Sequence, residues 1–275
     1  MDKLYTTLLV RAYFNIFKYF RSTGMKVMIT TGFPHPLASK TEIIDVLKGK
    51  ICSNIADFPL KIDGAVGVNL EGTAIVCGGE ETGSWKYSKK CYKFTNGGWQ
   101  KIASMKEARK GAAGIIYKKK WYVFGGWQSG RLKTSEIVSE NGGVSKGQEL
   151  PNKMYDHTFT TINSTFSVLS GGNYLFAFQN STLFREDFFS TETLYYNHKT
   201  NAFTNGPTLL KGRSAHGSAT CVDKVTNMTI PIVAGGKTSS GHTRTTELLI
   251  GGKWKAGTIH YSNLNCFLFN RKALF

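Results

Sequence analysis

The chain has 275 residues, enough to bury a sizeable core, and 41% of them are hydrophobic. The 13% aromatic content, 30 glycines and only 6 prolines favour an all-β globular protein with tight turns, and argue against a helical bundle or a disordered tail. The formal net charge of +17 attracts polyanions without specificity, but no recognition helix, zinc finger or RNA-binding motif accompanies it, so specific nucleic-acid binding is not expected.

The N-terminal segment, residues 1–24, has two interpretations. An amphipathic helix would place apolar residues four apart on one face: Leu4, Leu8, Ala12, Ile16 and Phe20. Alternatively, residues 14–20 form a strand that pairs with residues 25–31 across a short turn. Asp2 and the interruptions at Arg11 and Lys18 make this segment a poor secretory signal and too broken for a transmembrane span.

The main pattern of the chain is an apolar run that ends in two glycines. The copies end at Gly32, Gly79, Gly126, Gly172 and Gly236, with steps of 47, 47, 46 and 64 residues. The earliest copy has Thr31 in place of its first glycine. A recurrence of this size indicates a supersecondary unit repeated along one domain.

Each copy contains four predicted strands. In the clearest one, a small-residue strand (110–117), the run ending at Gly126, a third strand (134–140) and a fourth (142–150) follow one another with short turns. Equivalent runs occur in other copies at 64–70, 90–95, 97–103, 214–222, 245–250 and 251–257. One four-stranded meander cannot cover both of its faces, so we expect neighbouring sheets to pack radially around an axis. The glycine pair would allow the crowded strand near that axis to leave sharply.

A carboxylate recurs within the units. Glu42, Glu136 and Glu247 follow the last glycine of their copies by 10 or 11 residues. Because the same internal contacts are needed in every sheet, we predict a structural role for these three residues.

This pattern resembles the Kelch repeat, in which a strand ending in two glycines precedes a tyrosine-bearing strand and a spaced tryptophan. The resemblance covers residues 25–257 and predicts a β-propeller of four-stranded antiparallel blades, with five units visible, either as a five-bladed ring or as a truncated six-bladed one. The C-terminal tail, residues 258–275, is the candidate for a closing strand in the first blade. The signature residues are Gly32, Gly78, Gly79, Gly125, Gly126, Gly171, Gly172, Gly235, Gly236, Tyr92, Trp99 and Trp254.

The cysteines and sequons bear on the compartment. Cys77 ends one predicted strand and Cys91 begins the next, so a bridge between adjacent strands is geometrically conceivable. Such a bridge, together with glycosylation sequons at Asn163, Asn180 and Asn227, would suit an extracellular protein. The Kelch resemblance by itself implies the cytoplasm, so both compartments stay open.

No motif for catalysis is present in the sequence. The six histidines form no His-x-His or His-x3-His pair, no CxxC occurs, and no phosphate loop or nucleophile elbow is found. We therefore expect no metal, no cofactor and no enzymatic activity. The resemblance implies a protein-binding module instead, with a secreted carbohydrate-binding or galactose-oxidase-like propeller as the alternative, in which Trp85 and Trp127 would stack on sugar rings.

Partner binding is predicted for two sets of loops, because loops on a rigid scaffold carry recognition. One set precedes the small-residue strands, where similar Kelch modules place an arginine that faces an acidic peptide. The other set follows the glycine pairs and includes a long aromatic-rich insertion, 173–192. The candidates are Arg109, Lys110, Tyr155, His157, Arg213, His216, Trp127 and Arg131. We expect a protein or peptide partner, and the positive net charge favours an acidic one. The sequence leaves the oligomeric state open.

Overall fold

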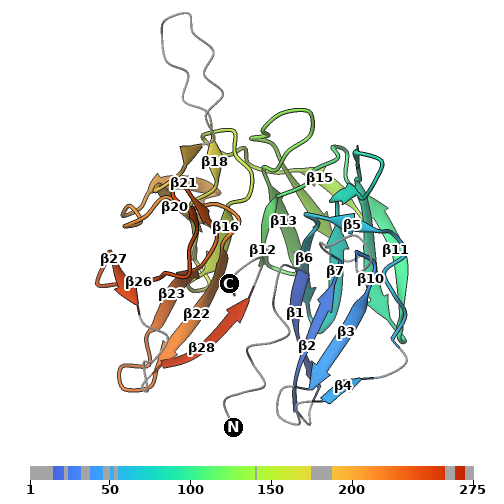
Figure 1. Ribbon diagram of the computed structural model, residues 1–275, viewed down its shortest axis with the longest axis horizontal. Helices are drawn as coiled ribbons and strands as arrows, with labels where there is room; N and C mark the ends of the chain where they lie inside the picture. Colours follow the sequence, from blue (N-terminus) through green and yellow to red (C-terminus); the bar gives the residue numbers. More distant parts are fainter. Residues whose placement is uncertain are drawn as a thin grey trace, which may run out of the picture.

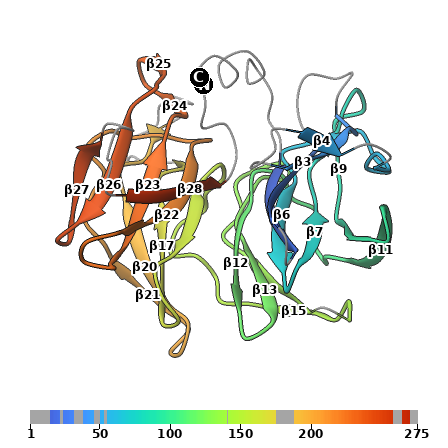
Figure 2. The ribbon, with the colours of Figure 1, turned by 90° about the horizontal axis from the view of Figure 1, so that it is seen from below.

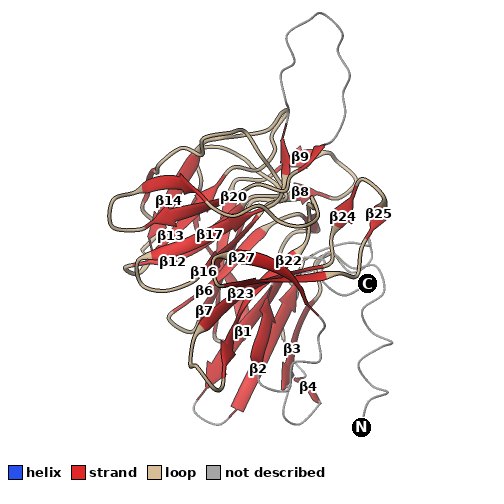
Figure 3. Ribbon diagram, turned by 90° about the vertical axis from the view of Figure 1, so that its left-hand side faces the viewer, coloured by secondary structure: helices blue, strands red, loops and turns tan. Residues whose placement is uncertain are grey.

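The computed structural model describes residues 15–21, 24–31, 38–45, 50–52, 55–139, 141–174, 188–257 and 264–269. Throughout these ranges the chain forms strands and loops, and none of the residues in them is helical (Figure 3). Accordingly, these ranges contain no helix that is long and apolar enough to cross a membrane.

Five antiparallel sheets follow one another along the chain (Figure 1). The first sheet contains β1 (Asn15–Arg21), β2 (Gly24–Thr30), β3 (Thr41–Asp45) and β4 (Lys50–Cys52). The second contains β6 (Val66–Leu70), β7 (Thr73–Cys77), β10 (Lys90–Thr95) and β11 (Gly98–Ser104). The third contains β12 (Ala113–Tyr117), β13 (Lys120–Phe124), β14 (Ser135–Ser139) and β15 (Val144–Lys146).

The last two sheets repeat this order. The fourth contains β16 (Thr158–Thr161), β17 (Phe166–Ser170), β20 (Thr193–Asn197) and β21 (Ala202–Asn205). The fifth contains β22 (Gly217–Asp223), β23 (Thr229–Ala234), β26 (Thr246–Ile250) and β27 (Lys253–Gly257), with β28 (Leu264–Phe269) added beside β22. Three short sheets come from loop segments of the second, fourth and fifth sheets. They are formed by β5 (Ile62–Asp63), β8 (Glu80–Glu81) and β9 (Lys86–Tyr87), by β18 (Asn173–Tyr174) and β19 (Phe188–Phe189), and by β24 (Lys237–Thr238) and β25 (Gly241–His242).

The five sheets are arranged like the blades of a propeller. Their first strands contact one another in succession, β1 with β6, β6 with β12, β12 with β16 and β16 with β22. These strands gather near the middle of the molecule (Figure 1), and Figure 2 shows β6, β12 and β22 from below. The all-β class and the repeated four-stranded antiparallel sheets predicted from the sequence are therefore confirmed.

The hydrophobic core lies between neighbouring sheets rather than within one. Val66 and Ile75 of the second sheet share a buried cluster with Trp121 and Val123 of the third. Similar clusters join the first sheet to the second, the third to the fourth, and the fourth to the fifth. Each sheet thus depends on its neighbours to remove its apolar faces from water.

The two ends of the chain differ from the repeat. Of the two N-terminal interpretations, residues 15–30 adopt the hairpin: β1 pairs with β2, with Arg21 opposite Gly24. Residues 1–14, the rest of the alternative helix, lie outside the described ranges. The tail strand β28 pairs with β22 of the fifth sheet and only approaches β1, which corrects the expectation that the tail supplies a strand to the first sheet (Figure 1).

The glycine pairs link each sheet to the next through the backbone. The first glycine donates its N–H to the third strand region of its own sheet, as from Gly78 to Lys90 at 3.1 Å. The second donates to the loop entering the following sheet, from Gly79 to Arg109 at 2.9 Å and from Gly126 to Met154 at 2.9 Å. The second glycine therefore lies against the backbone of another sheet.

We expect Gly126→Ala to destabilise the protein more than Gly72→Ala. Both glycines have a positive φ, 104° and 87° respectively, which costs alanine about 1 kcal/mol. At Gly126 an added Cβ would also lie 2.7 Å from the Lys110 carbonyl oxygen, whereas at Gly72 it meets nothing within 4 Å. Crowding should add about 1–3 kcal/mol at Gly126, measured by denaturant unfolding of both variants. Equal losses would show that the close approach to Lys110, at the entrance of the same sheet, does not require glycine.

Candidate partner-binding face

The two predicted sets of loops meet at one end of the sheets. The residue after each glycine pair forms an antiparallel backbone bridge with a residue that precedes a first strand. These bridges join Asp63 to Glu80, Lys110 to Trp127, Tyr155 to Asn173 and Ser214 to Lys237. The same local geometry thus recurs in four consecutive sheets and gathers eight side chains on one face.

Side-chain contacts connect these bridges to one another. Lys110 Nζ forms an ion pair with Glu80, and the ring of Trp127 lies edge-on to Tyr155 with centroids 5.3 Å apart. Asn173 Nδ2 donates to the Tyr155 hydroxyl at 3.3 Å and to Ser214 Oγ at 3.4 Å. We call this series the exit arc, defined as Glu80, Lys110, Trp127, Tyr155, Asn173, Ser214 and Lys237.

An arginine packs on the aromatic pair in the middle of the exit arc. Arg131 Cζ lies 5.5 Å from the ring centroid of Trp127 and 5.5 Å from that of Tyr155. All three side chains are partly exposed, and Gln128 and Ser129 beside them are exposed. The sequence predicted each of these three residues as a candidate, and the structure brings them together.

Charge and unpaired acceptors flank this stack. Burial lowers the pKa of Lys110, but the hydrogen bond and charge of Glu80 outweigh it, so the pKa lies above its ordinary value of 10.5. Lys237 is exposed, with its Nζ 5.7 Å from the ring of Phe189. Among the described residues, the buried oxygens Glu80 Oε1 and Asn173 Oδ1 accept no hydrogen bond. Buried acceptors without donors are rare, so both carry an unfilled capacity to bind a donor.

Arg109, predicted to face a partner, is instead buried inside the third sheet. Its side chain has no exposed area, and Nη1 donates to the carbonyl oxygens of Gly125 at 2.7 Å and Thr134 at 3.0 Å. Nη2 forms an ion pair with Glu136 at 2.9 Å. Glu136 also accepts the backbone N–H groups of Lys106 and Glu107, which confirms its predicted structural role.

Arg213 is placed in the same way in the fifth sheet, and the same correction applies. Its guanidinium group donates to the carbonyl oxygens of Gly235 and Thr245 and pairs with Glu247 at 2.6 Å. Glu247 accepts the backbone N–H groups of the loop residues at 210 and 211. We call each Arg–Glu pair with its carbonyl contacts an ionic tie. The third predicted carboxylate, Glu42, lies at the matching register position opposite Ile29.

Two other sheets fill the equivalent place with apolar residues. The backbone hydrogen bond from the second glycine of a pair identifies the position that corresponds to the tie arginine. The carbonyl oxygen of Arg109 accepts the N–H of Gly79, and the carbonyl oxygen of Met154 in the fourth sheet accepts that of Gly126. Met154 and Leu194 of the fourth sheet are both buried in one cluster, and Ile62 and Tyr92 of the second sheet form a similar pair. Three residues before Met154 and Ile62 the chain has Pro151 and Pro59, where the ionic ties have N–H donors at Lys106 and Leu210. Proline has no N–H, so these two sheets lack one of the two backbone donors that the glutamate accepts in an ionic tie.

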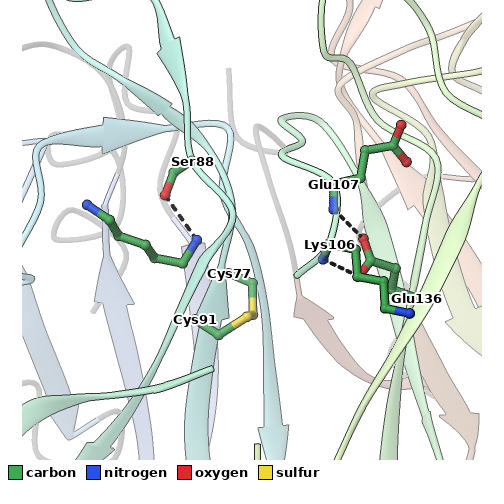
Figure 4. The surroundings of a disulfide bond; sticks show 7 residues. Cys77, Ser88, Cys91, Lys106, Glu107 and Glu136 are labelled. Atoms are coloured by element: carbon green, nitrogen blue, oxygen red, sulfur yellow. Dashed lines mark hydrogen bonds between the residues drawn. A yellow bond between two sulfur atoms is a disulfide. The ribbon is translucent and has the colours of Figure 1, made fainter. Parts of the chain in front are cut away.

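A disulfide lies close to the apolar pair of the second sheet. Cys77 and Cys91 are opposite one another on β7 and β10, are fully buried and are bonded to each other. Figure 4 shows this bond in the second sheet and, across from it in the third sheet, the Glu136 carboxylate that accepts the backbone N–H groups of Lys106 and Glu107. Cys221 is also disulfide-bonded, and Cys266 is the residue opposite it in the pairing of β22 with β28.

The candidates His157 and His216 are buried beneath the glycine pairs rather than exposed to a partner. His216 Nε2 lies 2.9 Å from Thr158 Oγ1, and a Cβ placed on Gly171 would touch the His216 ring at 2.6 Å. Burial, with smaller contributions from Arg213 and His157, holds the pKa of His216 well below its ordinary value of 6.5. These histidines therefore support the scaffold, and their candidate role in binding is corrected.

Four members of the exit arc were not among the individual candidates: Glu80, Asn173, Ser214 and Lys237. The first, second and fourth of these begin loops of the second predicted set, residues 80–85, 173–192 and 237–244. Three of them directly follow a glycine pair, as Trp127 does, so position within the repeat was the available signal. Residues 175–187 of the aromatic-rich insertion lie outside the described ranges. No group of three or more potential metal ligands occurs within the described ranges.

Comparison of the chain with protein-family models finds no match, and comparison with curated proteins finds no relative. The fold and the exit arc identify only the class of protein. It is an all-β protein of propeller-like architecture with a loop face assembled from four consecutive sheets.

We expect Arg109→Met to cost about 3–5 kcal/mol of unfolding free energy, because Glu136 would remain buried without its partner. The triple variant K106P/R109M/E136L copies the apolar arrangement of the fourth sheet and should recover most of that loss. Chemical denaturation of both variants measures the difference. An equal loss in the triple variant would show that the two arrangements are not interchangeable.

We expect His216 to make the fold sensitive to mild acid. Its folded pKa lies below the unfolded value of 6.5, so its contribution is complete above about pH 6.5 and falls as the pH drops toward the folded pKa. The loss can reach about 1.4 kcal/mol per pH unit for one group. His216→Gln should flatten the pH dependence of the unfolding free energy between neutral pH and pH 5, whereas the exposed His242→Gln should not. Parallel curves for the wild type and His216→Gln would refute this assignment.

Proposed function

We propose that the protein is a non-enzymatic Kelch-type propeller that binds a protein or peptide partner through the exit arc. The repeated glycine-pair signature and the propeller-like arrangement of the sheets support the Kelch assignment. The meeting of both loop sets on one face supports a binding surface, because a rigid scaffold presents loops in a fixed geometry.

The observation that carries this proposal is the stack of Arg131 on Trp127 and Tyr155. These three residue types dominate binding energy at protein interfaces, and here they lie together and partly exposed. Stacking restrains the guanidinium before any partner arrives, which reduces the entropy lost on binding.

The charge of the molecule favours an acidic partner segment. Arg131 and the exposed Lys237 lie on the loop face of a chain with a net charge of +17. A carboxylate matches the planar donor geometry of arginine. The unpaired acceptors of Glu80 and Asn173 complement this, because an extended peptide also supplies backbone N–H donors.

One observation favours the alternative of carbohydrate binding. Trp85 is 80% exposed at the tip between β8 and β9, away from the stacked aromatic pair, and an exposed indole ring stacks readily on apolar ligand faces. Binding of this kind would depend on Trp85 and not on Arg131. The two functions are therefore separable by substitution.

We expect a photo-crosslinking amino acid at Gln128 to capture a discrete protein partner in cells or extracts of the source organism. The same probe at Lys119, in the turn between β12 and β13, should not capture it, because this turn lies at the opposite end of the third sheet. Arg131→Lys in the Gln128 probe protein should reduce capture at least tenfold, since lysine keeps the charge and loses the planar stack.

Thermal unfolding of each probe protein provides the control for folding. Capture that is equal at both positions, or unchanged by Arg131→Lys, would contradict binding at the exit arc. Capture that depends on Trp85 and not on Arg131 would favour the carbohydrate-binding alternative.

A further inference from the structure

The disulfide in the core indicates folding in an oxidising compartment. Cys77 and Cys91 are fully buried and bonded, and Cys221 is bonded as well. Bonds of this kind persist in secreted and extracellular proteins and are rare in the cytosol. In the same compartment, asparagines in N-x-S/T sequons become acceptors for glycans when they are accessible.

Asn163 has the local geometry of an accessible acceptor. It lies in the turn between β16 and β17, is exposed, and begins the sequon Asn163-Ser164-Thr165. Its side-chain oxygen accepts the backbone N–H groups of Thr165 and Phe166, both at 2.8 Å, which fixes the side chain in an Asx turn. Among the described residues no hydrogen bond engages its Nδ2, the atom to which a glycan would be attached.

Asn227 occupies the equivalent turn of the neighbouring sheet, between β22 and β23. It is exposed, has a positive φ of 56° and begins the sequon Asn227-Met228-Thr229. Val225 and Met228 around it are exposed by 78% and 62%, so this tip presents apolar side chains to solvent. A glycan at Asn227 would partly cover them.

Both turns lie on the face opposite to the exit arc. Tyr155 and Ser214 of the exit arc precede β16 and β22, whereas Asn163 and Asn227 follow these two strands. The strands are neighbours and run side by side from one face of the molecule to the other. Glycans at these two positions would therefore cover the far face of two adjacent sheets and leave the exit arc open.

We propose that Asn163 and Asn227 are N-glycosylation sites, which confine partner binding to the face of the exit arc. The donor is an oligosaccharide joined through a diphosphate to a lipid. Asn Nδ2 forms a bond to C1 of the first sugar and gives up one proton, while the bond between C1 and the diphosphate oxygen breaks and the lipid diphosphate leaves with the electron pair. No oxidation or reduction accompanies the transfer.

The test uses the full chain, directed into the secretory pathway of cultured animal cells by an added leader. Asn180, whose sequon lies outside the described ranges, is replaced by glutamine throughout. Peptide N-glycosidase treatment in heavy-oxygen water, followed by peptide mass spectrometry, should show labelled aspartate at 163 and 227. Asn201, an exposed turn asparagine that has no sequon and is not followed by glycine, serves as the negative control.

Matched variants separate modification from folding. Thr165→Ala should remove one glycan while Thr165→Ser keeps it, and Thr229→Ala should do the same for the second, with the disulfides still formed. Secreted, disulfide-bonded protein without label at 163 or 227 would overturn the proposal for that position. Because this readout does not involve the partner, its failure leaves the proposed binding at the exit arc untouched.

Discussion

The structure depends on one backbone contact, made where a sheet leaves its glycine pair. The second glycine donates its N–H to the loop entering the next sheet, and the missing side chain of the first glycine leaves room for that loop's backbone. Before each first strand, a residue with positive φ donates its backbone N–H to the equivalent residue of the preceding sheet. These hydrogen bonds run from Gly111 to Gly64, from Asp156 to Gly111 and from Ala215 to Asp156. These contacts fix the position of each sheet relative to the next around the axis. The same apolar side chains of neighbouring sheets therefore always face one another in the clusters between them.

The contacts between the entering loop and the strands of its sheet are made in two chemically different ways. In two sheets a buried arginine and glutamate join the entering loop to the second and third strands, and in two others an apolar pair fills the same space. The choice extends to the preceding loop, where proline accompanies the apolar pair and an N–H donor accompanies the glutamate. This covariation follows from hydrogen-bond satisfaction: a glutamate without donors, or donors without a glutamate, would leave polar groups unpaired.

The repeat made most of the fold predictable, because the period and the glycine pairs locate the four repeated strands of the second, third and fifth sheets to within a few residues. The fate of Arg109 and Arg213 was not predictable in the same way. Each pairs with a glutamate 27 or 34 positions further along the chain, and only the folded sheet brings the two together. A charged residue at a loop is ordinarily exposed, so sequence alone placed these arginines in solvent. The tail was misplaced because pairing between ends of the chain depends on the closure of the whole arrangement.

The scaffold and the proposed recognition surface are adjacent in the chain. Arg109 is fully buried in its tie, and Lys110, the next residue, lies on the exit arc, because the chain turns between them at the bridge to Trp127. The bridge uses only backbone groups, so it forms with different side chains beyond the glycine pair. Glutamate, tryptophan, asparagine and lysine occupy this position in successive sheets, whereas the tie positions hold only two combinations. The backbone bridge therefore accommodates four different side-chain chemistries in one geometry, as a rigid scaffold with variable contact residues would.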